Sequence, residues 1–215
     1  MAADTNSSVA GRRLRILEVE TFGRGGLIHY AYNLSCALAE RGHEVFLVTT
    51  ARYELADREL PANVRLVKKL APFTGRFGKT LPAFVLQLGL KIEAVADAVR
   101  LMVLARRLRP DVIHFHSTNH SALAYLQLLR LVRRPVATTA HQVMPHEPVR
   151  FQRAISGRIH RLGHLVIAHS KVDRERLVSE FGLERERVVV IPHGEYGFFD
   201  SGGERVDRDA ARAGL

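Results

Sequence analysis

The feature that most constrains the fold is a regular alternation of short runs rich in Val and Ile with longer segments of helical periodicity. The apolar runs are residues 14–19, 44–50, 64–67, 111–117, 135–141, 164–170 and 187–194. The helical segments are residues 27–38, 81–108, 119–132, 149–162 and 171–181. Strands that alternate with helices form βαβ units, in which helices cover both faces of a parallel sheet. We therefore predict an α/β fold with a doubly wound, Rossmann-like parallel sheet of about seven strands.

Helix boundaries are marked by particular residues. Ser170 and Asp173 have the spacing of a capping box at a helix start. Three predicted helices are followed by a stop signal, at Gly42, Pro110 and Gly182. The long apolar segment 81–108 contains Gly89, where we expect a break. The first helix has apolar positions at helical spacing, namely Leu27, Tyr30, Ala31, Leu34 and Leu38.

The size of the chain predicts one domain. Its 215 residues, of which 47% are hydrophobic, are enough for a single core. We expect a flexible tail at residues 1–11, the folded domain at 12–199 and, at 200–215, a polar segment that leads into a further domain. Cys36 is the one cysteine, so an internal disulfide is excluded and a reducing compartment is favoured. The middle apolar stretch, residues 80–90, is shorter than the roughly 20 residues of a bilayer span.

The positive charge is concentrated in the middle of the sequence. The net charge is +10, and residues 61–161 alone hold 17 Lys and Arg against 4 Asp and Glu. Such a distribution indicates an anionic partner, which by charge alone is phosphate, a lipid surface or nucleic acid. A basic face that only keeps the protein soluble explains the same pattern. The chain has no Trp and no RNA-binding motif, so nucleic acid is not expected.

Four of the predicted strands end in a histidine. These histidines are His116, His141, His169 and His193. The carboxyl ends of parallel strands share one edge of the sheet, where doubly wound folds bind their ligands. A glycine-rich turn at residues 23–26 follows the first strand and opens a helix, so its N–H groups are suited to a phosphate or a sugar hydroxyl. The sequence therefore predicts a functional site at this edge.

Several nucleotide and metal motifs are absent. The dinucleotide fingerprint fails at Ile28, where a glycine is needed, so NAD is not expected. Residues 75–80 look like a phosphate-binding loop, but Phe73 stands where its first glycine belongs. A metal could be held by a set formed by His114 and His116 together with His141, His146 or Glu147. No zinc-type spacing accompanies that set, so no metal is expected.

Taken together, the motifs resemble a known family. They are FGRGG after the first strand, ALAERGHEVFLVTT, DVIHFHS, TAH and AHSKVDRERLVSEFGLERERVVVIPHGE. The chain is similar to the N-terminal domain of the retaining, nucleotide-sugar-dependent glycosyltransferases of GT-B fold, which include mannosyl- and glucosyltransferases. It departs from their pattern at His193, where an Asn is usual, and at Tyr196, where an Asp is common.

The resemblance implies roles for particular residues. His141 would be the catalytic residue that contacts the donor sugar, and Gly25 and Gly26 would lie near the acceptor and the donor phosphates. The remaining substrate-binding positions would be His116, Ser117, His193, Gly194 and Glu195. Such enzymes use no metal cofactor and no agreed protein nucleophile. Catalysis then rests on positioning and on electrostatic stabilisation of the leaving diphosphate.

The resemblance also implies partners and a missing half. The donor domain of such enzymes has no counterpart here, so we expect a fragment or a one-domain relative that is inactive alone. The expected partners are a nucleotide-sugar donor, a glycan or lipid-linked acceptor, and an anionic membrane surface met by residues 65–81. We expect a cytoplasmic location, with peripheral association at the inner membrane face as a further hypothesis. The alternative function is a non-catalytic module of the same fold that binds a sugar or phosphate.

Overall fold

The fold is a seven-stranded, fully parallel sheet. The computed structural model describes residues 11–70, 82–116, 120–141, 143 and 152–194. Its strands are β1 (Arg15–Val19), β2 (Glu44–Thr50), β3 (Val64–Leu70), β4 (Val112–Phe115), β5 (Val136–Ala140), β6 (Leu165–Ala168) and β7 (Val188–Val190). Their order in the sheet is β3-β2-β1-β4-β5-β6-β7, and each neighbouring pair is parallel. The predicted Rossmann-like sheet is thus confirmed, with its strand order reversing between β1 and β4.

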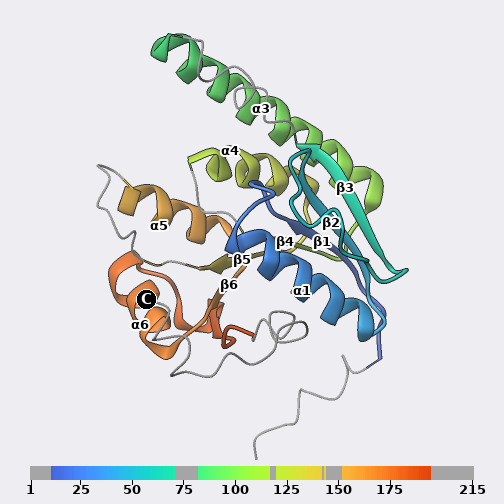
Figure 1. Cartoon of the computed structure of the whole chain (residues 1–215). Coiled ribbons are helices and arrows are strands. Elements are labelled where there is room, and N and C mark those ends of the chain that lie inside the picture. Colours follow the sequence, from blue (N-terminus) through green and yellow to red (C-terminus); the bar gives the residue numbers. More distant parts are fainter. Residues whose placement is uncertain (1–10, 71–81, 117–119, 142, 144–151, 195–215) are drawn as a thin grey trace, which may run out of the picture.

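Helices cover both faces of this sheet. They are α1 (Gly26–Glu40), α3 (Ala83–Leu108), α4 (His120–Leu129), α5 (Gln152–Leu162) and α6 (Lys171–Phe181), with short 3-10 turns η1 (Arg130–Val132) and η2 (Arg185–Arg187). Figure 1 shows α3, α4 and α5 side by side on one face, and α1 on the opposite face. Helix α6 lies next to α5, on the same face as α3 and α4. Arg161 of α5 donates a hydrogen bond of 2.9 Å to the carbonyl of Phe181, the last residue of α6.

The core is divided between the two faces. The largest cluster of buried side chains joins the sheet to α3, α4 and α5 through residues such as Leu101, Leu126 and Ile159. A smaller cluster packs α1 on β2 and β3 through Ile28, Ala31 and Leu47. Strands covered on both faces read as continuous apolar runs, as β1, β2 and β5 do, whereas the edge strand β3 is partly exposed.

The helix ends follow the sequence signals. Ser170 caps α6, accepting a hydrogen bond of 3.0 Å from the backbone N–H of Asp173. Gly182 ends the same helix in the left-handed conformation with φ 65°. Helix α3 ends at Leu108 before Pro110, and Arg109 is its left-handed C-cap, whose N–H bonds to the carbonyl of Ala105.

The expected break at Gly89 is wrong, because α3 runs unbroken from Ala83 to Leu108. A glycine inside a helix costs only about 1 kcal/mol, which a helix of 26 residues can absorb. The buried residues of α3 begin at Ala94, and its first turns project past α4 (Figure 1). None of the described helices is long and apolar enough to cross a membrane.

The first helix also differs in detail from its apolar periodicity. Its fully buried residues are Ile28, Ala31, Ser35 and Ala39. Tyr30 and Leu34 are only half-buried, because their side of α1 faces the segment that follows β7. Part of the apolar side of α1 therefore packs on the core, and the other part faces the edge of the sheet where the sequence predicts the site.

Candidate functional site

The four histidines at the strand ends meet around one aromatic ring. They follow β4, β5, β6 and β7, which are consecutive neighbours in the sheet. The ring centroid of Tyr30, on α1, lies 5.5 Å from His116, 4.7 Å from His141, 5.3 Å from His169 and 5.1 Å from His193. The predicted convergence of these histidines is confirmed. A single tyrosine from the covering helix holds them together.

A buried carboxylate on the neighbouring strand β1 bonds to histidines of this edge. Glu18 lies in β1, directly opposite His114 of β4, and its side chain is fully buried. One oxygen of the carboxylate, Oε2, is 2.5 Å from His116 Nε2 and 3.0 Å from His114 Nδ1. Nε2 of His114 is in turn 2.7 Å from Thr139 Oγ1. The two inner strands are thereby linked at the position where the strand order reverses.

The electrostatics of Glu18 favour its ionised form. Burial alone would raise the pKa of its carboxyl, but charge interactions and hydrogen bonds with His114 and His116 outweigh burial and lower the pKa to about 2. The pKa of His116 is lowered, mainly by burial and then by His114. An ionised carboxylate can only accept, so Nε2 of His116 donates and Nδ1 of the neutral ring carries the lone pair.

Two nitrogens of the cluster lack a partner among the described residues. They are His116 Nδ1 and His141 Nε2, both buried. Burial, followed by the proximity of His116, lowers the pKa of His141 to about 2, so its imidazole is neutral at pH 7. A buried polar atom without a partner is costly, which makes both nitrogens candidates for hydrogen bonds to a ligand hydroxyl.

The glycine turn before α1 is held by carboxylates. Both carboxylate oxygens of Glu20 accept backbone N–H groups at 2.7 Å, one from Phe22 and the other from Gly23. Glu54 accepts the N–H of Gly25 at 2.7 Å. A phosphate bound at Gly25 must therefore displace Glu54. Gly26, the other predicted glycine, is the first residue of α1 and is exposed.

An open pocket lies beside the histidines. It has a volume of about 440 Å³ and separates α1 from the segment after β7. Its lining consists of Tyr30, Asn33, Leu34, Ala37, Arg41, Ile191, Pro192, His193 and Gly194. The predicted residues His193 and Gly194 thus belong to the same edge as His141, whereas Ser117, Glu195, His146 and Glu147 lie outside the described residues.

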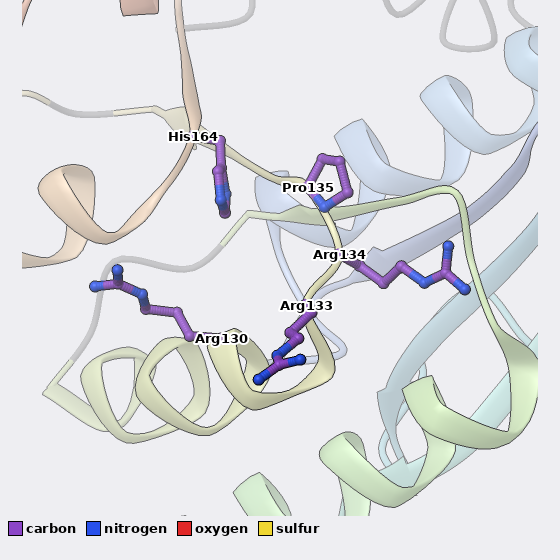
Figure 2. Close-up of a pocket in the computed structure, with 5 residues that line it drawn as sticks. All are labelled: Arg130, Arg133, Arg134, Pro135 and His164. Atoms are coloured by element: carbon purple, nitrogen blue, oxygen red, sulfur yellow. The ribbon is translucent and has the colours of Figure 1, made fainter.

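A basic pocket occupies the opposite edge of the sheet. It is lined by Arg130, Arg133, Arg134, Pro135 and His164, just before β5 and β6 begin. Figure 2 shows the three arginine side chains pointing in different directions. Side chains that diverge do not offer convergent donors to one anion, so this pocket accounts for part of the basic charge without forming a defined phosphate site.

Sequence reasoning missed the residues that organise the site. In the sequence, Tyr30 has the spacing of an apolar helix face and Glu18 lies inside an apolar run, so neither is marked as a site residue. The usable signal for Glu18 was a carboxylate within a strand predicted to be buried, because a buried charge requires a partner. Glu20 and Glu54, which hold the glycine turn, were likewise missed.

The strand order and the helices on both faces of the parallel sheet define the class as a doubly wound, Rossmann-like α/β domain. A sequence profile of Glycosyltransferase Family 4 matches residues 24–194, and the chain belongs to this family. It is similar to a glycogen synthase of Mycobacterium tuberculosis, with 28% identity over 190 residues that cover 79% of this chain and 44% of the relative. The chain therefore spans less than half the length of that relative.

Solved structures share the fold. A glycosyltransferase from Rickettsia africae matches 88% of this chain and 45% of its own, with TM-score 0.60 and 16% identity. Anabaena HepE in complex with UDP and glucose matches 85% of this chain and 45% of its own, with TM-score 0.57 and 18% identity. A UDP-GlcNAc 2-epimerase from Neisseria meningitidis bound to UDP-GlcNAc matches 82% and 45%, with TM-score 0.57 and 12% identity. The chain is thus an N-terminal GT-B domain, and its family identifies it with glycosyltransferases.

Proposed function

We propose that the chain is the acceptor-side half of a glycosyltransferase that moves a sugar from a nucleotide-sugar donor to an acceptor with retention of configuration. The observation that carries the proposal is the group of four imidazoles around Tyr30 at the carboxyl edge of the sheet. Two similar structures bind UDP, one together with glucose and the other as UDP-GlcNAc, which supports a nucleotide-sugar donor.

His141 is the residue we assign to the donor sugar. Its Nε2 is buried and without a partner among the described residues, while the ring is fixed against Tyr30 with an interplanar angle of 85°. A neutral, oriented imidazole is suited to a hydrogen bond with a sugar hydroxyl that strengthens in the transition state. His116, braced by Glu18, would line the same site.

The chain alone should not complete transfer. The site on this chain is open to solvent. Stabilisation of a leaving diphosphate requires hydrogen-bond donors in a cleft that excludes water. The test is to incubate the purified chain with a panel of nucleotide sugars and follow release of the nucleoside diphosphate. We expect none above background, and release by the same chain joined to a donor domain from an extended reading frame. Robust release by the short chain would overturn the half-enzyme proposal.

A lipid-linked acceptor at a membrane surface is supported by α3. Large apolar residues recur every three or four positions on one exposed side of this helix, at Phe84, Leu88, Ile92, Val95, Val99 and Val103. The opposite, buried side of the helix packs on the core through Ala98, Leu101 and Ala105. Of the basic segment 65–81, Lys68 and Lys69 are exposed at the end of β3, and residues 71–81 lie outside the described residues. Exposed apolar side chains on one side of a helix favour insertion into a lipid surface, and basic residues favour anionic lipid.

A further inference from the structure

We propose that His141, His169 and His193 form a binding site for one divalent transition-metal ion of the zinc class. One ring nitrogen from each of the three lies within 4.8 Å of the other two. The inference goes beyond the proposed sugar transfer and does not depend on it. The expectation that transfer itself needs no metal stays a separate prediction.

The spacing of the first pair already suits an ion. Nδ1 of His141 and Nε2 of His169 are 3.4 Å apart. Two imidazole nitrogens bound to a tetrahedral ion at about 2.0–2.1 Å are separated by about 3.4 Å. His193 completes the triangle from the segment after β7, with its ring centroid 4.9 Å from that of His169.

Hydrogen bonds set the ring tautomers that a metal requires. Nδ1 of His169 is 3.0 Å from the carbonyl of Ile191, which can only accept, so Nδ1 carries the proton and Nε2 the lone pair. Nδ1 of His193 is likewise 3.0 Å from the Gly194 carbonyl. A backbone carbonyl that holds the outer N–H of a histidine is the usual support of a metal ligand.

The third ligand is compatible with the role proposed for His141. An ion on its Nδ1 fixes the tautomer with the proton on Nε2, the nitrogen that has no partner among the described residues. Ligation and contact with a sugar hydroxyl would then use different nitrogens of one ring.

The chemistry of the ligands selects the ion. Three imidazoles suit Zn²⁺ and its transition-metal neighbours, whereas Mg²⁺ and Ca²⁺ prefer oxygen. Because His193 is exposed, the fourth position opens to solvent, as in zinc sites that bind a water or a substrate. The other candidate group, Glu18 with His114 and His116, is fully buried and its facing atoms already bond one another.

The test uses the untagged chain freed of metal by a chelator. We expect calorimetry with Zn²⁺ to show one tight ion per chain, and Co²⁺ to give the visible absorption of a tetrahedral site. Mg²⁺ should give no heat. His169→Asn and His193→Asn should each weaken Zn²⁺ binding at least tenfold. His29→Asn, which changes a histidine of α1 outside the group, should bind as the wild type does.

Two results would overturn the proposal. One is the absence of Zn²⁺ binding by the wild-type chain. The other is unchanged affinity in His193→Asn, whose exposed position keeps this variant folded even where His169→Asn is not. Circular dichroism of each variant verifies the fold.

Discussion

Glu18 of β1 and His116 after β4 are joined by a hydrogen bond of 2.5 Å although 98 residues separate them in the chain. Both side chains are fully buried, and the bond lies where the strand order of the sheet reverses. A buried carboxylate is stable only when it is paired, so this contact stabilises the fold and orients the imidazole at the site together.

Glu18→Gln should lower the free energy of unfolding at pH 7 by about 1–3 kcal/mol, because a hydrogen bond to a charged acceptor becomes a neutral one. The folded pKa of about 2 lies below the ordinary value of 4.5, so the carboxylate contributes its full stability above pH 4.5 and loses it as the pH falls towards 2. Urea unfolding followed by circular dichroism should show the gap between wild type and variant narrowing over this range. A gap independent of pH would contradict the assignment.

His160 of α5 gives a second pH dependence, at milder acidity. Its ring is fully buried, and neither nitrogen has a partner among the described residues. Burial lowers its pKa from 6.5 to about 4, so the stability of the neutral form is complete above pH 6.5 and is lost as the pH falls towards 4. Between pH 7 and pH 5 the wild type should lose about 2 kcal/mol of unfolding free energy through His160, and His160→Leu should not show this loss. Equal pH profiles for wild type and His160→Leu would refute the prediction.

Two glycines of the turn before α1 should respond differently to alanine. Both have a positive φ, 71° at Gly23 and 72° at Gly25, and the ψ of −167° at Gly25 places this residue in a region essentially confined to glycine. A Cβ at Gly23 would also lie 2.5 Å from Thr50 Oγ1, whereas at Gly25 it meets nothing within 4 Å. Gly25→Ala should therefore lose stability through backbone strain alone, about 1–3 kcal/mol in urea unfolding, whereas Gly23→Ala should lose part of its stability through the contact with Thr50. Adding Thr50→Ala should then recover stability in Gly23→Ala and not in Gly25→Ala. Equal effects of Thr50→Ala in the two variants would show that the contact with Thr50 relaxes freely.

The sequence was sufficient to predict the sheet and the meeting of the histidines. The inner strands are buried, and β3 at the edge of the sheet exposes Arg65, Lys68 and Lys69 but keeps apolar residues between them, so the apolar runs predict the strands. Parallel strands must bring their carboxyl ends to one edge. His116, His141, His169 and His193 were therefore expected together before any contact was known.

The partners of those histidines were not predictable in the same way. Whether Glu18 is a surface or a buried residue depends on its cross-strand neighbour His114, which is 96 residues away. Tyr30 has the spacing of a core residue, and periodicity does not distinguish packing on a sheet from packing on a ring of imidazoles. The partners of the histidines are therefore set by contacts between residues far apart in the sequence, which local periodicity does not reveal.

The exposed stripe of α3 predicts how the chain meets a membrane. Phe84→Glu should reduce flotation with vesicles that contain anionic lipid, because it replaces an apolar side chain that is 76% exposed with a charge of the same sign as the lipid. Gln87→Glu adds the same charge to an exposed position off the stripe and should have a smaller effect. Equal flotation on neutral vesicles, or equal losses in the two variants, would count against insertion of the stripe.

His141→Ala tests the assignment of the site in the two-domain enzyme, that is, the chain joined to a donor domain. The side chain packs against Tyr30 at the open edge of the sheet and takes no part in the three buried clusters of the core, so the melting temperature should change little. The rate of transfer should fall at least tenfold, which corresponds to about 1.4 kcal/mol of transition-state stabilisation. His164→Ala, at the opposite edge of the sheet, is the matched control and should leave transfer unchanged. Lost stability with normal turnover would instead make His141 a structural residue.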